Sequence, residues 1–319
     1  DDTIYGSNSW DVLRGQEGDD TIEGGKGDDH IDGGTGNNTI VFNKGDGRDY
    51  VYSAGGTDTL KFNDVENFGE LVCASDGTNL IIRYPGNGQV VVLNYFANNG
   101  VHSVQQVEVN GETKSIAALL SEYVTEHGSL ASAISGEVGG TAENDTYIGS
   151  NGVDIIRSED GDDTIYASEG DDHYDGGLGN NTIVYDLDNF GNDTIYLRPN
   201  ENMTIDMSAY GFSENDINYY YSGENLVIGT TKGNVIINRF AAIDNTGSSG
   251  SVTLKLDNEH NIDLRQKNYT INTNSSFNGT WHNEIIDARS AGGTVEINGM
   301  GGDDTIYGSN SWDVLRGQE

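Results

Sequence analysis

The chain has 319 residues and a formal net charge of −36, from 52 acidic and 16 basic residues, with a single cysteine. This charge excludes nucleic acid as a natural partner and disfavours an anionic membrane surface. One thiol cannot form a disulfide framework, and no apolar run reaches the roughly 18 residues that span a bilayer. The acidic residues recur beside apolar positions rather than in runs, so we expect a folded chain, and its length predicts two domains.

The chain opens with nine-residue repeats. Residues 6–41 contain consecutive copies of the pattern G-G-x-G-x-D-x-U-x, where U is a large apolar residue. Glycine at positions 1, 2 and 4 suits a tight turn, because glycine adopts positive φ without a steric penalty. Positions 7 to 9 read as a short strand whose apolar position 8 points inward. The sequence therefore predicts an all-β fold built on a parallel β-roll that binds Ca²⁺ in its turns.

Two repeats make one right-handed coil, so turns on the same side of the roll lie 18 residues apart. Stacked strands are about 4.8 Å apart, and carboxylates at that spacing repel unless a cation lies between them. Carboxylates and turn carbonyls favour a hard divalent cation. The lack of a thiolate cluster or paired histidines argues against zinc, iron or copper. The acidic edges of the first tract are Asp2, Asp20 and Asn38 on one side and Asp11 and Asp29 on the other.

Residues 42–138 form a predicted β-rich unit, with alternating strands separated by Gly-, Asn- and Asp-rich turns. One helix is predicted, with Ser115 as its N-cap and its end at Gly128. Its apolar face is expected to pack on the sheet or cap the roll, and Cys73 is expected to be a buried apolar side chain. The residues of that face are Ile116, Leu119, Leu120, Tyr123 and Val124.

A second roll is predicted over 139–184 and a second β-rich unit, without a helix, over 185–290. The acidic edges of this roll are Asp145, Asp163 and Asn181 on one side and Asp154 and Asp172 on the other. Segment 32–42 aligns with 175–185, which indicates an internal duplication. The first 17 residues recur identically at 303–319. We therefore expect a tandem module of 302 residues, with 291–319 as the start of the next roll.

The repeats resemble those of the RTX (repeats-in-toxin) family, and 42–138 is similar to the haemolysin-type calcium-binding related domain that often follows them. In that family, Ca²⁺ is held by the carbonyls at positions 2 and 4 and the Asp of one repeat. The carbonyls at positions 1 and 3 and the Asp of the repeat stacked above complete the site. The resemblance also implies type I secretion of an unfolded chain, which folds in the millimolar Ca²⁺ outside the cell.

Transferred residue by residue, the resemblance names four stacked sites and part of a fifth. They are Ser7, Ser9 and Asp11 with Gly24, Lys26 and Asp29; Gln16, Gly18 and Asp20 with Gly33, Thr35 and Asn38; Ser150, Gly152 and Asp154 with Ala167, Glu169 and Asp172; Glu159, Gly161 and Asp163 with Gly176, Leu178 and Asn181; and Met300, Gly302 and Asp304 with the following copy, Asp145 and Asp313 being further ligands. Asn at 38 and 181 removes a charge, and Ser9 replaces a glycine. Sites that include these positions are expected to be weaker or absent.

No enzymatic site is expected. The H-E-x-x-H and G-x-S-x-G motifs are absent, and the periodic carboxylate pairs are better explained as metal ligands than as a glycosidase dyad. Neither Pro85 nor Pro199 follows an Asp, so Asp-Pro self-cleavage has no basis. His30 and His173 occupy position 7 and are expected to face solvent.

The expected function is structural: an adhesin shaft, extension arm or extracellular fibre within a large secreted or cell-surface bacterial protein. Its expected partners are further copies of itself, joined end to end, with no nucleic acid and no membrane insertion. Two alternatives remain. The chain could be the C-terminal secretion-and-folding block of an RTX toxin or polysaccharide-modifying enzyme. It could also bind a glycan or cell-surface ligand through aromatic residues, for which the candidates are Trp10, Trp281, Trp312 and Tyr219–Tyr221.

Overall fold

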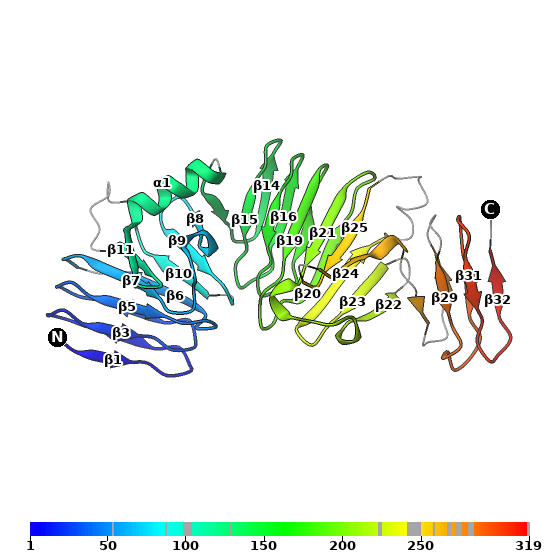
Figure 1. Ribbon diagram of the computed structural model, residues 1–319, viewed down its shortest axis with the longest axis horizontal. Coiled ribbons are helices and arrows are strands. Elements are labelled where there is room, and N and C mark those ends of the chain that lie inside the picture. Colours follow the sequence, from blue (N-terminus) through cyan, green and yellow to red (C-terminus); the bar gives the residue numbers. More distant parts are fainter. Residues whose placement is uncertain are drawn as a thin grey trace. The chain divides into compact units, whose positions relative to one another are not determined.

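The computed structural model describes residues 1–52, 54–86, 88–97, 104–127, 129–222, 225–240, 250–257, 259–266, 269–271, 276–279 and 284–317. The chain divides into two compact units, Asp1–Ala133 and Ile134–Glu319. Both are built from β-strands, many of them parallel (Figure 1). The predicted all-β class with parallel β-rolls is confirmed.

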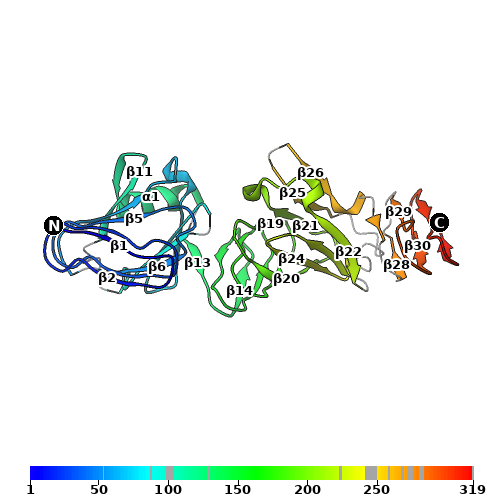
Figure 2. The ribbon, with the colours of Figure 1, turned by 90° about the horizontal axis from the view of Figure 1, so that it is seen from below.

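Unit 1 contains two facing sheets; Figure 2 shows β1 and β5 in one layer and β2 and β6 in the other. Within the unit, one sheet has the order β1-β3-β5-β7-β11-β12 and the other β2-β4-β6-β10-β9-β8-β13. The strands are β1 (Thr3–Tyr5), β2 (Val12–Arg14), β3 (Thr21–Glu23), β4 (His30–Asp32), β5 (Thr39–Phe42), β6 (Arg48–Tyr52), β7 (Asp58–Phe62), β8 (Val72–Ser75), β9 (Leu80–Tyr84), β10 (Gly88–Val92), β11 (Val104–Val109), β12 (Glu112–Ser115) and β13 (Ala131–Ala133).

The predicted coil of two repeats is present. Successive strands alternate between the sheets, and each pairs in parallel with the strand one coil later, so that Ile4 lies opposite Ile22. Position 8 points between the sheets, where Ile22 and Ile31 are fully buried. The parallel stacking continues past residue 41, because β6 pairs with β4 and β7 with β5. The antiparallel strands β8–β10 and the β11–β12 hairpin then extend the two sheets.

The helix α1 (Ile116–His127) begins where the sequence predicts. The Ser115 hydroxyl accepts a hydrogen bond from the Ala118 N–H at 3.1 Å, which confirms the N-cap. Ile116, Leu119 and Tyr123 are buried in the core of unit 1, so this face packs on the sheets. Val124, which the sequence also places on this face, is 39% exposed and is not among the buried residues of the helix. Cys73 is fully buried, as predicted.

Unit 2 repeats this plan. One sheet has the order β15-β17-β19-β21-β25-β26 within the unit, and the other β14-β16-β18-β20-β24-β23-β22. These strands are β14 (Glu137–Thr141), β15 (Thr146–Ile148), β16 (Ile155–Glu159), β17 (Thr164–Tyr166), β18 (His173–Asp175), β19 (Asn180–Val184), β20 (Gly191–Tyr196), β21 (Asn202–Asp206), β22 (Asn218–Ser222), β23 (Asn225–Gly229), β24 (Gly233–Asn238), β25 (Val252–Lys255) and β26 (Asn261–Asp263).

The internal duplication is visible in the topology. In unit 1, β10 pairs in parallel with β6 and antiparallel with β9; in unit 2, β24 makes the same contacts with β20 and β23. A further pair of three-stranded sheets, β27-β29-β31 and β28-β30-β32, ends the described chain. Their strands are β27 (Tyr269–Thr270), β28 (Ser276–Asn278), β29 (Ile285–Asp287), β30 (Glu296–Asn298), β31 (Thr305–Tyr307) and β32 (Val314–Arg316).

Short 3₁₀ segments connect some strands: η1 (Phe68–Glu70), η2 (Ser208–Tyr210), η3 (Glu214–Asp216) and η4 (Leu264–Gln266). None of the helices in the described part of the chain is both long and apolar enough to cross a bilayer. The predicted division into five segments remains a prediction.

Candidate metal-binding turns

The Asp or Asn at position 6 makes one recurring contact. Its Oδ1 accepts a hydrogen bond from the main-chain N–H of the same position in the preceding coil, as from Asp11 to Asp29 at 2.8 Å. This contact fixes the carboxylate and leaves Oδ2 facing its own turn, where a Cβ on Gly24 would lie 2.4 Å from Asp29 Oδ2. The same contact joins Asp2 to Asp20, Asp20 to Asn38, Asp145 to Asp163, Asp154 to Asp172, and Asp163 to Asn181.

One class of turn, which we call open, has position 2 in the left-handed region. Examples are Gln16 at φ 71°, Glu159 at φ 69° and Met300 at φ 77°. Gly25, in the turn of Asp29, also has positive φ, at 87°. In the open turns of Asp20, Asp29 and Asp304, the Oδ2 atom of the acid is buried and accepts no hydrogen bond. Asp163 Oδ2 and, in a longer turn, Asp193 Oδ2 also lack a bond of ordinary geometry, although the nearby hydroxyls of Ser158 and Tyr185 partly stabilise their charge. Burying an unpaired carboxylate oxygen is costly, so each of these oxygens is a candidate ligand for a cation.

A second class, which we call closed, has Ser or Thr at position 2. The Ser7 N–H donates to Asp11 Oδ2 at 2.6 Å, and the Ser7 hydroxyl accepts from the Ser9 N–H at 3.2 Å. Hydrogen bonds from the Ser7 N–H lower the pKa of Asp11. Closed turns therefore satisfy the acid within the turn. The same acid contact is made by Thr141 to Asp145, Ser150 to Asp154 and Ser309 to Asp313.

Two of the predicted sites lie between two open turns: Gln16, Gly18 and Asp20 below Gly33, Thr35 and Asn38, and Glu159, Gly161 and Asp163 below Gly176, Leu178 and Asn181. Their turns also contact each other directly, because the Thr35 N–H donates to Gln16 O at 2.7 Å and the Gly161 N–H to Leu178 O at 2.9 Å. Each carbonyl retains a second lone pair for a metal.

The asparagines of these sites bond to the next coil. Asn38 Nδ2 donates to Asp58 Oδ1 at 3.0 Å, and Asn181 Nδ2 donates to Glu201 Oε1 at 3.3 Å. The amide thus places a donor where Asp would place a second charged oxygen.

The other two sites pair a closed turn with the turn above it. Asp11 lies below Asp29, whose Oδ2 is unpaired. Asp154 lies below Asp172, whose Oδ2 accepts hydrogen bonds from the Ser168 and Tyr174 hydroxyls at 2.8 and 2.9 Å. Sequence analysis singled out no departure from the repeat pattern at this last site. Asp172 Oδ2 nevertheless already accepts hydrogen bonds from the protein, whereas Asp29 Oδ2 does not.

Sequence analysis missed acids in the longer coils that follow each tract. Asp49 Oδ1 accepts from the Asp29 N–H at 2.9 Å, and Asp193 Oδ1 accepts from the Asp172 N–H at 2.9 Å. They lie 20 and 21 residues beyond their partners, which breaks the strict period. The signal was an Asp two residues before a buried strand residue, as in Asp49 before Val51.

These buried acids have perturbed electrostatics. Burial raises the pKa of Asp49 to about 8, and the charges of Asp29 and Asp46 contribute. Burial also raises the pKa of Asp193 to about 9 and that of Glu201 to about 7. At neutral pH without a cation, Asp49 and Asp193 favour the protonated form and Glu201 lies near its titration midpoint; a bound cation favours the carboxylate in each case.

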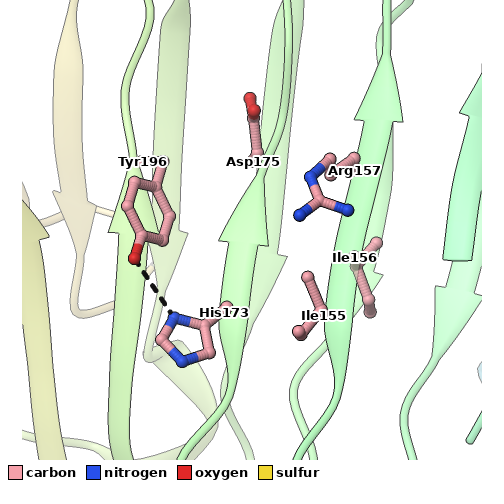
Figure 3. A pocket seen from close by; sticks show the side chains of 6 residues that line it. All are labelled: Ile155, Ile156, Arg157, His173, Asp175 and Tyr196. Carbon is pink, nitrogen blue, oxygen red and sulfur yellow. Dashed lines mark hydrogen bonds between the residues drawn. The ribbon is translucent and has the colours of Figure 1, made fainter. Parts of the chain in front are cut away.

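Position 7 lies on the outer face, as expected. His30 stacks on Tyr50 with ring centroids 4.9 Å apart. In unit 2, His173 lines an open pocket of about 290 Å³ with Arg157, Asp175 and Tyr196, and its Nδ1 lies 3.4 Å from the Tyr196 hydroxyl (Figure 3).

Within the described ranges, no three His, Cys, Asp or Glu side chains converge as a metal cluster.

A comparison of the sequence with models of protein families matches the segments that contain these turns. A family model described as the RTX calcium-binding nonapeptide repeat matches residues 5–40, 45–60, 148–183 and 296–319. These segments are RTX repeats. The match at 45–60 covers Asp49 and Asp58, which lie within the segment predicted as the first β-rich unit. Ca²⁺ fits the open RTX turns, because their unpaired buried carboxylate oxygens and free carbonyl lone pairs are the ligands that it prefers.

A search of curated proteins finds no match. Among solved structures, the extracellular lipase LipA from Serratia marcescens is 17% identical, with a TM-score of 0.24. The alignment covers 74% of this chain and 37% of the lipase chain. A similarity at this level carries no argument about the activity of the RTX repeats described here.

Proposed function

We propose that this chain is a Ca²⁺-binding structural segment of a large secreted or cell-surface protein, where it forms part of an extended shaft or fibre. It folds when it meets Ca²⁺ outside the cell. The observation that carries the proposal is the strand pairing of two identical 17-residue sequences. One copy pairs with the coil that follows it, and the other pairs with the coil that precedes it.

Residues 1–17 and 303–319 are identical. In the first copy, β1 pairs with β3 of the following coil, and Thr3 lies opposite Thr21. In the second copy, β31 pairs with β29 of the preceding coil, and Thr305 lies opposite Ile285. The same strand sequence thus accepts a parallel neighbour on either side.

The turn contacts are complementary in the same way. The Asp2 N–H donates forward to Asp20 Oδ1 at 2.6 Å. Its counterpart Asp304 accepts from the preceding coil, with the Glu284 N–H 3.1 Å from Asp304 Oδ1. If one copy of the sequence made both sets of contacts, the roll would run from one module into the next without a linker. The partner that fits these edges is a second copy of the same module.

The electrostatics support folding that depends on external Ca²⁺. The carboxyls of Asp49 and Asp193 favour their protonated forms when no cation is bound, so folding at neutral pH without metal requires proton uptake. In the low Ca²⁺ of a cytosol, this cost favours the unfolded chain that type I secretion needs. No catalytic role is proposed.

The two alternatives have weaker support. A secretion-and-folding block of a toxin or enzyme needs only one module, whereas the identical segments favour an array. For glycan binding, Tyr219 packs partly against the core of unit 2, while Tyr220 is exposed. Trp281 lies outside the described residues, as does the Tyr221 side chain.

The test is a chain with two tandem copies of residues 1–302, studied by small-angle scattering and electron microscopy. We expect a stiff two-module particle in saturating Ca²⁺ and loss of that stiffness in chelator. Two modules that pivot freely in saturating Ca²⁺ would contradict the continuous roll and the shaft function.

A further inference from the structure

The two rolls contain matching turns that differ at a few positions. Segment 24–32 reads GGKGDDHID and segment 167–175 reads ASEGDDHYD. Both place the acid at the same point of the coil, and both acids accept the N–H of the coil below at 2.8 Å. The differences are at positions 1, 2, 3 and 8 of the repeat, and two of them introduce hydroxyl groups.

Those hydroxyl groups reach the acid. The Tyr174 hydroxyl donates to Asp172 Oδ2 at 2.9 Å, and the Ser168 hydroxyl donates to the same oxygen at 2.8 Å. At Asp29 the corresponding residues are Ile31 and Gly25, which carry no donor, and Oδ2 is buried without a partner. Hydrogen bonds to a charged acceptor are among the stronger ones in proteins, so the oxygen at Asp172 gains what a cation would otherwise supply.

The hydroxyls cannot easily leave. Tyr174 is fully buried in the core of unit 2, and Ser168 is 3% exposed. A cation bound to Asp172 Oδ2 would displace the Ser168 and Tyr174 hydroxyls, and because both are buried, neither could form a replacement hydrogen bond with water. The acid of the coil below is also hydrogen-bonded within its turn, because Asp154 Oδ2 accepts from the Ser150 N–H at 2.6 Å.

We propose that the stacked turns of Asp154 and Asp172 hold no Ca²⁺, and that the Tyr174 and Ser168 hydroxyls replace the metal there. The matching turns of Asp11 and Asp29 do take an ion. The second roll thus contains a coil closed by hydrogen bonds rather than by metal. This inference rests on the proposed Ca²⁺-dependent function, and it changes the expectation that Asp172 is a ligand.

The test counts the Ca²⁺ ions bound per full chain, by equilibrium dialysis and titration calorimetry, in variants whose circular dichroism in saturating Ca²⁺ equals that of the wild type. Asp29→Asn is expected to lose one ion, and Asp172→Asn to lose none. Asn keeps the Oδ1 acceptor, as the natural Asn38 does for the Asp20 N–H. Tyr174→Phe is expected to gain one ion and to need more Ca²⁺ to fold, because it removes a donor from the buried oxygen. Tyr196→Phe, which removes an exposed hydroxyl from the outer face, is the control and is expected to change neither quantity.

The outcomes separate the two ideas. Loss of one ion in both Asp variants would overturn the inference and leave the proposed function intact. An unchanged count in Tyr174→Phe would also overturn the inference. If that variant does not regain the wild-type spectrum, the Asp29→Asn and Asp172→Asn pair decides. A wild-type chain that binds no Ca²⁺ would overturn both the inference and the function on which it rests.

Discussion

Replacing Asp49 with Asn is expected to stabilise the metal-free chain while weakening its response to Ca²⁺. Burial raises the pKa of Asp49 from 3.8 to about 8. At pH 7 the unfolded chain carries this group ionised, and the folded metal-free chain must protonate it. Each pKa unit corresponds to about 1.4 kcal/mol, so roughly three units between 3.8 and pH 7 make folding about 4 kcal/mol less favourable at neutral pH than in acid.

Asn has no proton to take up, and it can keep the Oδ1 contact with the Asp29 N–H. We expect Asp49→Asn to raise the free energy of unfolding in chelator at pH 7 by about 2 to 4 kcal/mol, the lower figure allowing for an amide without a full set of acceptors. In millimolar Ca²⁺ the variant is expected to gain less stability than the wild type, because it has lost a charged ligand.

The direction of the pKa shift of Asp49 determines how the stability of the metal-free chain changes with pH. A folded-state pKa above the unfolded value contributes stability that is complete below about pH 4 and is lost as the pH rises through about 8. The metal-free wild type is therefore expected to unfold more readily at pH 8 than at pH 5, and Asp49→Asn to reduce this slope. Far-ultraviolet circular dichroism in chelator at both pH values, which reports the fraction of folded chain, measures it. The control Glu112→Gln removes one charge from an exposed position of β12. Equal effects of the two substitutions at pH 7 would show that the gain comes from net charge, and would refute the reasoning.

Three further results are expected. Gly36→Ala should destabilise the Ca²⁺-bound chain by about 2 kcal/mol or more, since Gly36 has φ 120° and a Cβ there would lie 2.1 Å from Gly18 O. The control is Gly55→Ala, because Gly55 has open space around it. Equal unfolding midpoints for the two variants would contradict this geometry. His30→Ala should leave the number of bound Ca²⁺ ions unchanged, because position 7 lies on the outer face; loss of an ion in calorimetry would show that the repeat register is misassigned. Mg²⁺ at the same concentration should fail to replace Ca²⁺ in folding, because it demands a tighter octahedral site; equal circular dichroism spectra with the two ions would contradict a site built on carbonyls of stacked turns.

Much of the roll could be predicted from the sequence, because its period determines both the coil and the inward direction of position 8. Ile22 and Ile31 are buried for this reason. The acids of the longer coils could not be predicted, because longer turns carry Asp49 and Asp193 out of the nine-residue register while their strands still stack in parallel.

The ranking of the candidate sites could not be predicted either. The repeat pattern treats Ser7 and Gln16 as equivalent position-2 residues, but only Gln16 adopts the left-handed conformation that leaves the acid of its turn unpaired. The pattern also treats Tyr174 as a large apolar residue. Its hydroxyl contact with Asp172 depends on how the tyrosine ring lies between the sheets, which a one-dimensional pattern does not contain.

The central claim is that Ca²⁺ binding and folding of the rolls are one event. Far-ultraviolet circular dichroism of the full chain, recorded in chelator and across a Ca²⁺ titration at neutral pH, tests it most directly. The buried unpaired oxygens of Asp20, Asp29 and Asp304 predict a large loss of β signal in chelator and its recovery at millimolar Ca²⁺. An identical β spectrum with and without Ca²⁺ would contradict the account.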